Sequence, residues 1–171
     1  RERADRTRRA CDGRLWVAGQ GVYAEYEDAL GLRRLHTAPE QASIYHPIDF
    51  GFPSAEQSYQ MLRYAEYAMR NDIVPGPRGG RLIWSSNWEP PLYSSLGLYP
   101  QETINLLLCY YRLGLTEKAD ELLRGVEASF VRGPCPGGIA HNQRPDGTHF
   151  GSTDFTDTSS MFVRTVVEGL F

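Results

Sequence analysis

Three carboxylates and two tyrosines are interleaved in the segment 21–31: Glu25, Glu27, Asp28, Tyr23 and Tyr26. In a helix Glu25 and Asp28 would share one face, whereas in an extended strand Glu25 and Glu27 would share one. Close carboxylates beside aromatic rings suit the cleavage of glycosidic bonds, which needs one protonated carboxyl group and one ionised carboxylate. Taken alone, the segment favours an exposed acidic turn.

Glu25 and Asp49 form the predicted catalytic pair. The flanking tyrosine rings could keep water from Glu25 and favour its protonated form, as a general acid requires. Asp49 precedes a glycine turn, and its polar surroundings would keep it ionised and able to activate water. Asp28 is the reserve, because a neighbouring carboxylate can favour the protonated form of one member of a pair. Asp154 and Glu102 are further acids that could take these roles.

Both members of this pair also have a structural interpretation. Buried acids often fasten loops to helix N-termini or to arginines such as Arg33 and Arg63. In that case neither Glu25 nor Asp49 would act on a substrate.

Several aromatic and amide side chains could bind a sugar: Tyr23, Tyr45, His46, Asn87 and Trp88. His46 lies before a proline that fixes the local backbone, and from a loop it could orient a substrate hydroxyl group. Asn87 can form paired hydrogen bonds, and the adjacent Trp88 offers an indole face for stacking on a sugar ring. The alternatives are a structural histidine and a tryptophan packed in the core.

Four helices are predicted to position these residues, at 55–70, 100–113, 116–130 and about 157–170, with a fifth at 2–11. Ser54 and Gln57 have the spacing of a capping box, and Tyr59, Leu62, Ala65 and Met69 follow at helical spacing. Pro100 suits a first helical turn, Gly114 a helix end, and Thr116 and Asp157 suit N-caps. A connection as short as 114–116 predicts an antiparallel hairpin whose apolar stripes meet.

Long segments rich in polar and aromatic residues connect the helices, at 12–53, 71–99 and 132–156. Ordered loops of this length usually carry function. Strand patterns are limited to short pieces such as 14–18 and 81–84. The sequence therefore predicts a mainly α fold with elaborate loops.

Composition and charge exclude several classes of protein. The chain has 171 residues and a net charge of −3. After the arginine-rich first nine residues, 13 Lys and Arg oppose 19 Asp and Glu, so a nucleic-acid groove is not expected. Apolar runs are too short to span a membrane. The three cysteines have no disulfide or zinc-site spacing, and neither a metal nor a cofactor is predicted.

Three segments, in order, resemble an incompletely characterised bacterial branch of the six-hairpin (α/α)6-toroid glycosidase superfamily: GVYAEYEDALGLRRLHTAPEQASIYHPIDFGFPSAEQSYQMLRY, WSSNWEPP and DFTDTSSMFVRTVVEGLF. The resemblance covers about residues 15–171. It implies an inner and an outer ring of six helices each, a sugar site formed by loops at one end, and a periplasmic or secreted location. Twelve helices with their connections need roughly 190 residues. Residues 1–171 are therefore predicted to be a C-terminal fragment of a single catalytic toroid, a partial (α/α)6 toroid built of antiparallel hairpins.

Three functions remain open at this point. The first is an inverting glycoside hydrolase acting on a poly- or oligosaccharide. The second is a polysaccharide lyase in which Tyr45 or His46 removes a proton beside a carboxylate held by Asn87 or Arg81, although the acidic segment disfavours an anionic substrate. The third is a noncatalytic helical-repeat scaffold, suggested by residues 110–119, but no second copy follows at ~34-residue spacing.

Overall fold

Amphipathic helices make up most of the regular structure of the chain. The computed structural model describes residues 2–76, 78–88, 96–132, 135 and 138–171. The helices are α1 (Glu2–Arg14), α2 (Ala42–Asp49), α3 (Ala55–Tyr67), α4 (Pro100–Arg112), α5 (Thr116–Arg132) and α6 (Thr156–Thr165), which continues as the π-helix η1 (Val166–Leu170). The predicted mainly α fold is confirmed.

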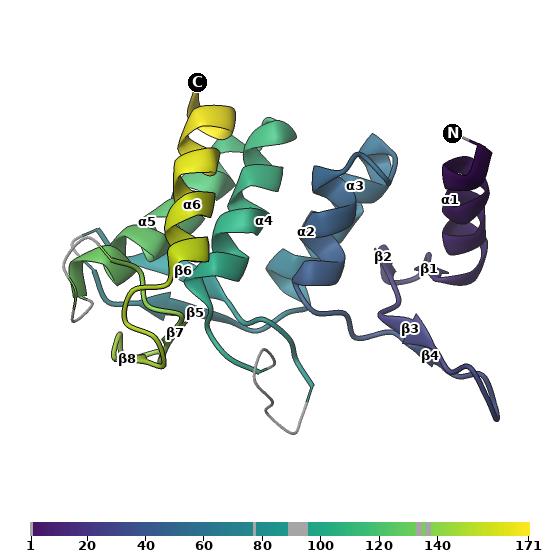
Figure 1. Ribbon diagram of the computed structural model, residues 1–171, viewed down its shortest axis with the longest axis horizontal. Coiled ribbons are helices and arrows are strands. Elements are labelled where there is room, and N and C mark those ends of the chain that lie inside the picture. The colour runs from purple at the N-terminus through teal and green to yellow at the C-terminus, as the bar shows by residue number, and fades with distance from the viewer. Residues whose placement is uncertain (1, 77, 89–95, 133–134, 136–137) are drawn as a thin grey trace.

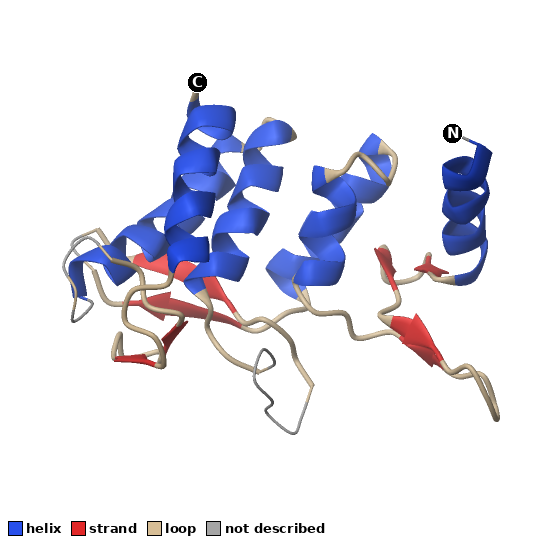
Figure 2. Cartoon of the chain, viewed as in Figure 1, coloured by secondary structure: helices blue, strands red, loops and turns tan. Residues whose placement is uncertain are grey.

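Within the described residues, eight short strands form four separate antiparallel hairpins. They are β1 (Trp16–Val17) with β2 (Val22–Tyr23), β3 (Tyr26–Glu27) with β4 (Leu35–His36), β5 (Asn71–Val74) with β6 (Gly80–Ile83), and β7 (Asn142–Gln143) with β8 (His149–Phe150). Figure 2 shows these strands and the longest loops gathered at one end of the helices. We call this end the loop face.

Helices α2, α4 and α6 stand side by side, with α1 at the far edge of the molecule (Figure 1). The last residue of α2, Asp49, forms ion pairs with Arg112 in the last turn of α4 and Arg164 in the last turn of α6. The C-terminal ends of the three helices therefore lie together, and their N-termini open toward the loop face.

The predicted hairpin of two helices is confirmed by α4 and α5. Gly114 adopts a left-handed conformation (φ 73°) between them, which glycine reaches without steric cost. Leu107 of α4 and Leu122 of α5 are both buried in the same core cluster. The capping box of Ser54 and Gln57 is also present at the start of α3.

Some predicted helix starts and faces are wrong in detail. Thr116 is the first residue of α5, where its hydroxyl group donates to the carbonyl oxygen of Gly114. Asp157 lies in the first turn of α6, and the cap position belongs to Phe155. Tyr59 is predicted on the apolar face of α3, but its side chain is 46% exposed. Met61 and Leu62 are the buried residues of this turn. Cap and face positions shift by one or two residues when tertiary contacts fix the helix ends.

The prediction of an irregular segment at 12–53 is wrong for residues 42–49, which form α2. Pro47 lies inside this helix, although a proline has no N–H group and costs roughly 3 kcal/mol in a helix interior. Ile44, Tyr45 and Ile48 are buried on one face of α2, and that burial offsets the cost. Tyr45 and His46 are consequently held by a helix and not by a loop.

Strand β6 crosses α5 at a point where two glycines meet. A Cβ atom on Gly125 would overlap the carbonyl oxygen of Arg81, and one on Gly80 would overlap the backbone of Gly125. The absence of side chains at these two positions lets the β5–β6 hairpin lie directly on α5.

We predict that Gly125→Ala destabilises the protein by about 1–3 kcal/mol, because backbone atoms must move apart. Alanine is intrinsically the better helix former by roughly 1 kcal/mol, so the helix propensity alone predicts the opposite sign. Gly13→Ala in α1 is the matched control, since a Cβ there meets nothing within 4 Å. Urea unfolding of both variants measures the difference, and equal stability of the two would contradict the close crossing.

Candidate functional site

Glu25 lies at the loop face, one residue before β3. Its Oε2 accepts a hydrogen bond from the backbone N–H of Glu40 at 3.0 Å. Glu25 also lines a pocket of about 440 Å³. Aromatic groups from three parts of the chain complete much of the lining: Tyr26 of β3, His36 of β4 and Trp88. The structure therefore brings together two residues that the sequence analysis singled out separately, Glu25 and Trp88.

The most strongly perturbed carboxyl group at the loop face belongs to Glu102, in the first turn of α4. Its pKa is raised to about 7, mainly by burial and also by the negative charge of nearby Glu40, against the opposing effect of a hydrogen bond with the Tyr45 hydroxyl group. Its Oε2 is buried and has no hydrogen-bond partner among the described residues. A carboxyl group with this pKa can hold a proton near neutral pH and give it up in a reaction.

Glu40 links Glu102 to Glu25. The pKa of Glu40 is raised, first by burial and then by the negative charge of Glu25. Glu40 in turn acts on Glu102, and burial together with both Glu102 and Glu40 raises the pKa of Tyr45 well above its usual value. Adding negative charge to the cluster of Glu40, Glu102 and Tyr45 is therefore unfavourable. The cluster consequently keeps one carboxyl proton at a pH where isolated glutamates are ionised.

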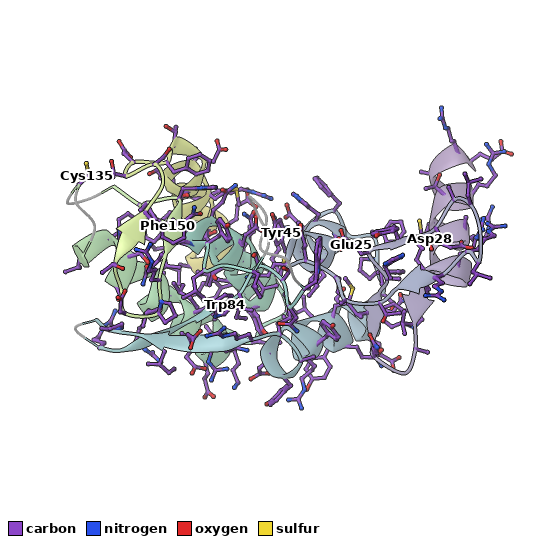
Figure 3. All side chains as sticks on the ribbon, turned by 90° about the horizontal axis from the view of Figure 1, so that it is seen from below. Glu25, Asp28, Tyr45, Trp84, Cys135 and Phe150 are labelled. Carbon is purple, nitrogen blue, oxygen red and sulfur yellow. The ribbon has the colours of Figure 1, made fainter. Side chains whose placement is uncertain are left out.

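Asp28, the reserve acid, contacts a histidine in the structure. Its Oδ1 lies 2.8 Å from Nε2 of His36, and the His36 ring stacks on Tyr26 with ring centres 4.0 Å apart. Figure 3 looks onto the loop face and shows Glu25 between Tyr45 and Asp28 along the long axis of the molecule. Asp28 thus orients the aromatic pair that forms one wall of the pocket.

Asp49 is not brought together with Glu25. It pairs with Arg112 and Arg164 at the C-terminal ends of the helices, whereas Glu25 contacts the backbone just before α2 begins. Hydrogen bonds from Arg164 are the largest cause that lowers the pKa of Asp49, so this carboxylate is ionised, as predicted. In the structure Asp49 fastens three helices together. This agrees with the structural interpretation of Asp49, except that its arginine partners are Arg112 and Arg164.

The remaining predicted sugar-binding residues are mostly occupied by protein contacts. Tyr23 is buried, and its hydroxyl group contacts Asp12 and Gln57. The Asn87 amide accepts from Arg70 N (2.9 Å) and donates to Ala68 O (2.7 Å), so it closes the end of α3.

His46 is exposed and lies in a mainly apolar pocket with Phe50. Trp88 is half-buried, and among the described residues its Nε1 has no hydrogen-bond partner. Of the predicted sugar-binding set, Trp88 is the residue that lines the pocket beside Glu25. Tyr45 affects the candidate site through its hydrogen bond with the Glu102 carboxyl group.

Glu40, Glu102 and His36 are the functional candidates that the sequence analysis missed or placed second. Nothing in the periodicity around Glu102 distinguishes it from an exposed acid in the first turn of a helix. The signal that could have found it is the apolar pattern on all sides of 103–111, which predicts a buried helix and hence a poorly solvated first turn.

A larger pocket of about 660 Å³ lies between the β1–β2 turn and α3, but its described lining holds no carboxylate. The described residues contain no group of three or more side chains that could hold a metal ion. Within the same residues no helix has the length and apolar character needed to cross a membrane. Comparison with known protein families gives no match, and comparison with curated proteins gives none either. The functional argument therefore depends on the geometry of the loop face.

We predict that Glu102→Gln changes how stability depends on pH. In the native protein the raised pKa favours the protonated form, so wild-type stability falls as pH rises from the ordinary value of 4.5 to about 7. Glutamine has no proton to lose, so the stability of the variant relative to wild type should rise by up to about 3 kcal/mol between pH 5 and 8. Glu117→Gln, in the exposed first turn of α5, is the control. Parallel pH curves for wild type and Glu102→Gln would contradict the assignment.

We also predict that Asp49→Asn destabilises the protein by about 2 kcal/mol at pH 7, because two guanidinium groups lose a carboxylate that is only 10% exposed. The lowered pKa means that this contribution is present above pH 3.8 and is lost as the pH falls below that value. Asp5→Asn on the exposed α1 is the control. Denaturant unfolding at pH 7 measures both, and a loss below 0.5 kcal/mol would show that the ion pairs do not hold the helices.

Proposed function

We propose that the chain is the part of a glycoside hydrolase that carries an acid and a base at the loop face. The observation that carries the proposal is the Glu102 carboxyl group, whose pKa is raised to about 7 beside Glu40. It lies at the same end of the helices as the pocket lined by Glu25, whose backbone neighbour Glu40 links the two acids. Glycoside hydrolysis by inversion needs a protonated carboxyl group for the leaving oxygen and a carboxylate that activates water. Glu102 is assigned the first role.

Glu25 is assigned the second role. It lines the pocket directly, and only one of its two oxygens is used by the backbone N–H of Glu40. The other oxygen can accept a proton from a water molecule. Trp88 and Tyr26 provide aromatic faces on which a sugar ring can stack beside this carboxylate.

The arrangement of the helices supports a partial (α/α)6 toroid. Helices α2, α4 and α6 run in the same direction side by side, and α3 and α5, which follow α2 and α4 in the chain, run back toward the loop face (Figure 1). In such a toroid the first set would form the inner ring and the second the outer ring. The loop face would then be the end at which the substrate binds.

The lyase alternative has less support, because its residues are separated. Arg81 pairs with Glu121 of α5, Asn87 is used at the end of α3, and His46 lies on the exposed side of α2. The raised pKa of Tyr45 keeps its hydroxyl group protonated, which makes it a poor base. The scaffold alternative does not account for a buried acid at a pocket-bearing face.

The decisive experiment combines activity with product analysis. The chain, and any longer natural protein that contains it, is incubated with plant and microbial polysaccharides, and reducing ends and unsaturated products are both measured. Reducing ends without unsaturated products support a hydrolase, and absorbance from unsaturated products would instead establish a lyase.

We predict that Glu102→Gln and Glu25→Gln each lower kcat by at least ~10² while the protein remains folded. Wild-type kcat should fall as the pH rises above about 7, because Glu102 then loses its proton. Asp49→Asn is the control: it removes a carboxylate at the opposite end of the helices and should leave kcat of the folded protein nearly unchanged. Normal turnover in both glutamine variants would overturn the assignment.

A further inference from the structure

The pocket beside Glu25 shares part of its lining with a second pocket. The second pocket has a volume of about 590 Å³ and lies between α1 and the β3–β4 hairpin. Glu25 and Tyr26 line both pockets. Each volume lies within the range of pockets that hold small organic ligands, so a ligand that fills both must be longer than one that fills either.

The wall between the two pockets is built as a platform. Tyr26 is 51% exposed, and its ring stacks nearly parallel on His36, with an interplanar angle of 19°. The carboxylate of Asp28 holds His36 from the other side at 2.8 Å. Because the lower partner is fixed, the exposed tyrosine ring is held in place and can bind a flat apolar surface such as the face of a sugar ring.

Three arginines also line the second pocket: Arg6, Arg14 and Arg33. Arg14 and Arg33 both pair with Glu27, at 2.9 and 3.1 Å, and Arg6 of α1 lies outside that ion-pair network among the residues that the structure describes. A guanidinium group has five N–H donors and no acceptor, so Arg6 suits the hydroxyl oxygens of a sugar.

We infer that these two pockets form one groove for a chain of several sugar units, with Glu25 and the Tyr26–His36 platform at its centre. One sugar binds beside Trp88, the next crosses the platform, and a further unit reaches Arg6. This inference rests on the proposed function for the position of the reacting bond, which lies next to Glu25. It assigns the substrate class as an internal stretch of an oligo- or polysaccharide and not a single terminal sugar.

Binding as a function of ligand length tests the groove without depending on catalysis. The folded chain is titrated calorimetrically with gluco-, xylo-, manno-, chito- and galacturono-oligosaccharides of one to six units. For the sugar that binds, affinity should increase at least ~10-fold from one unit to three or four and then level off. Equal affinity for one unit and six, or no binding by any member of the series, would overturn the groove.

Single substitutions assign the two ends. Trp88→Ala should weaken binding of every length, whereas Arg6→Ala should lower affinity roughly 10-fold only for ligands of three or more units. Tyr26→Ala should remove the increase in affinity between ligands of one and three sugar units. Arg9→Ala, on the same helix but outside the pocket, and Tyr59→Ala, on α3, are the matched controls.

The binding test and the kinetic test distinguish failure of the groove from failure of the catalytic roles. Length-dependent binding without hydrolysis would leave the groove in place and reject the catalytic roles of Glu25 and Glu102. Hydrolysis that releases only single terminal units, with affinity independent of length, would keep the hydrolase and reject the groove. An Arg6→Ala effect equal to that of Arg9→Ala would also reject it.

Discussion

Helix α4 must be buried on nearly all sides, and the rest of the structure follows from how this is achieved. Nine of its thirteen residues are buried, which is more than one packing partner can cover. Helices α2, α5 and α6 all pack against it, and each presents an apolar face that would otherwise meet water. The α4–α5 hairpin, the helical state of 42–49 and the position of α6 are three consequences of burying this single helix.

Burial of α4 also creates the chemistry at its first turn. Glu102 is carried into a region with little water because the residues that follow it belong to the core. The negative charge of Glu40 and the lack of a partner for Oε2 add to the effect, and the result is a carboxyl group that holds its proton near neutral pH. The unfavourable free energy of burying the Glu102 carboxyl group is offset by the packing of α4.

The two ends of the same helices use carboxylates in opposite ways. At the C-terminal end, Asp49 is matched by two arginines, which lower its pKa and make it a fixed tie between α2, α4 and α6. At the loop face, burial and the other acids nearby raise the pKa values of Glu40 and Glu102. The ion pairs that fasten the three helices therefore lie at one end, and carboxyl groups with raised pKa values lie at the other.

Local patterns in the sequence determined the helices that carry their own signals. The capping box at Ser54, Pro100 at a helix start and Gly114 at a helix end each act within a few residues, so α3, α4 and α5 could be predicted from the chain alone. The acidic segment 21–31 and Trp88 were likewise recognisable as candidates, because their residue types are suited to sugar chemistry wherever they lie.

Only the tertiary structure decided which candidates meet and which acid is perturbed. Asp49 finds its partner Arg164 at a separation of 115 residues, and Glu25 meets Trp88 through the fold of the loops. The helical state of 42–49, despite Pro47, depends on a buried face supplied by α4 and α3. A pKa depends on burial and on charges brought close by folding, so the composition of a segment cannot determine it. For this reason the sequence identified the kinds of residues at the candidate site, and only the fold raises the pKa of Glu102 while it lowers that of Asp49.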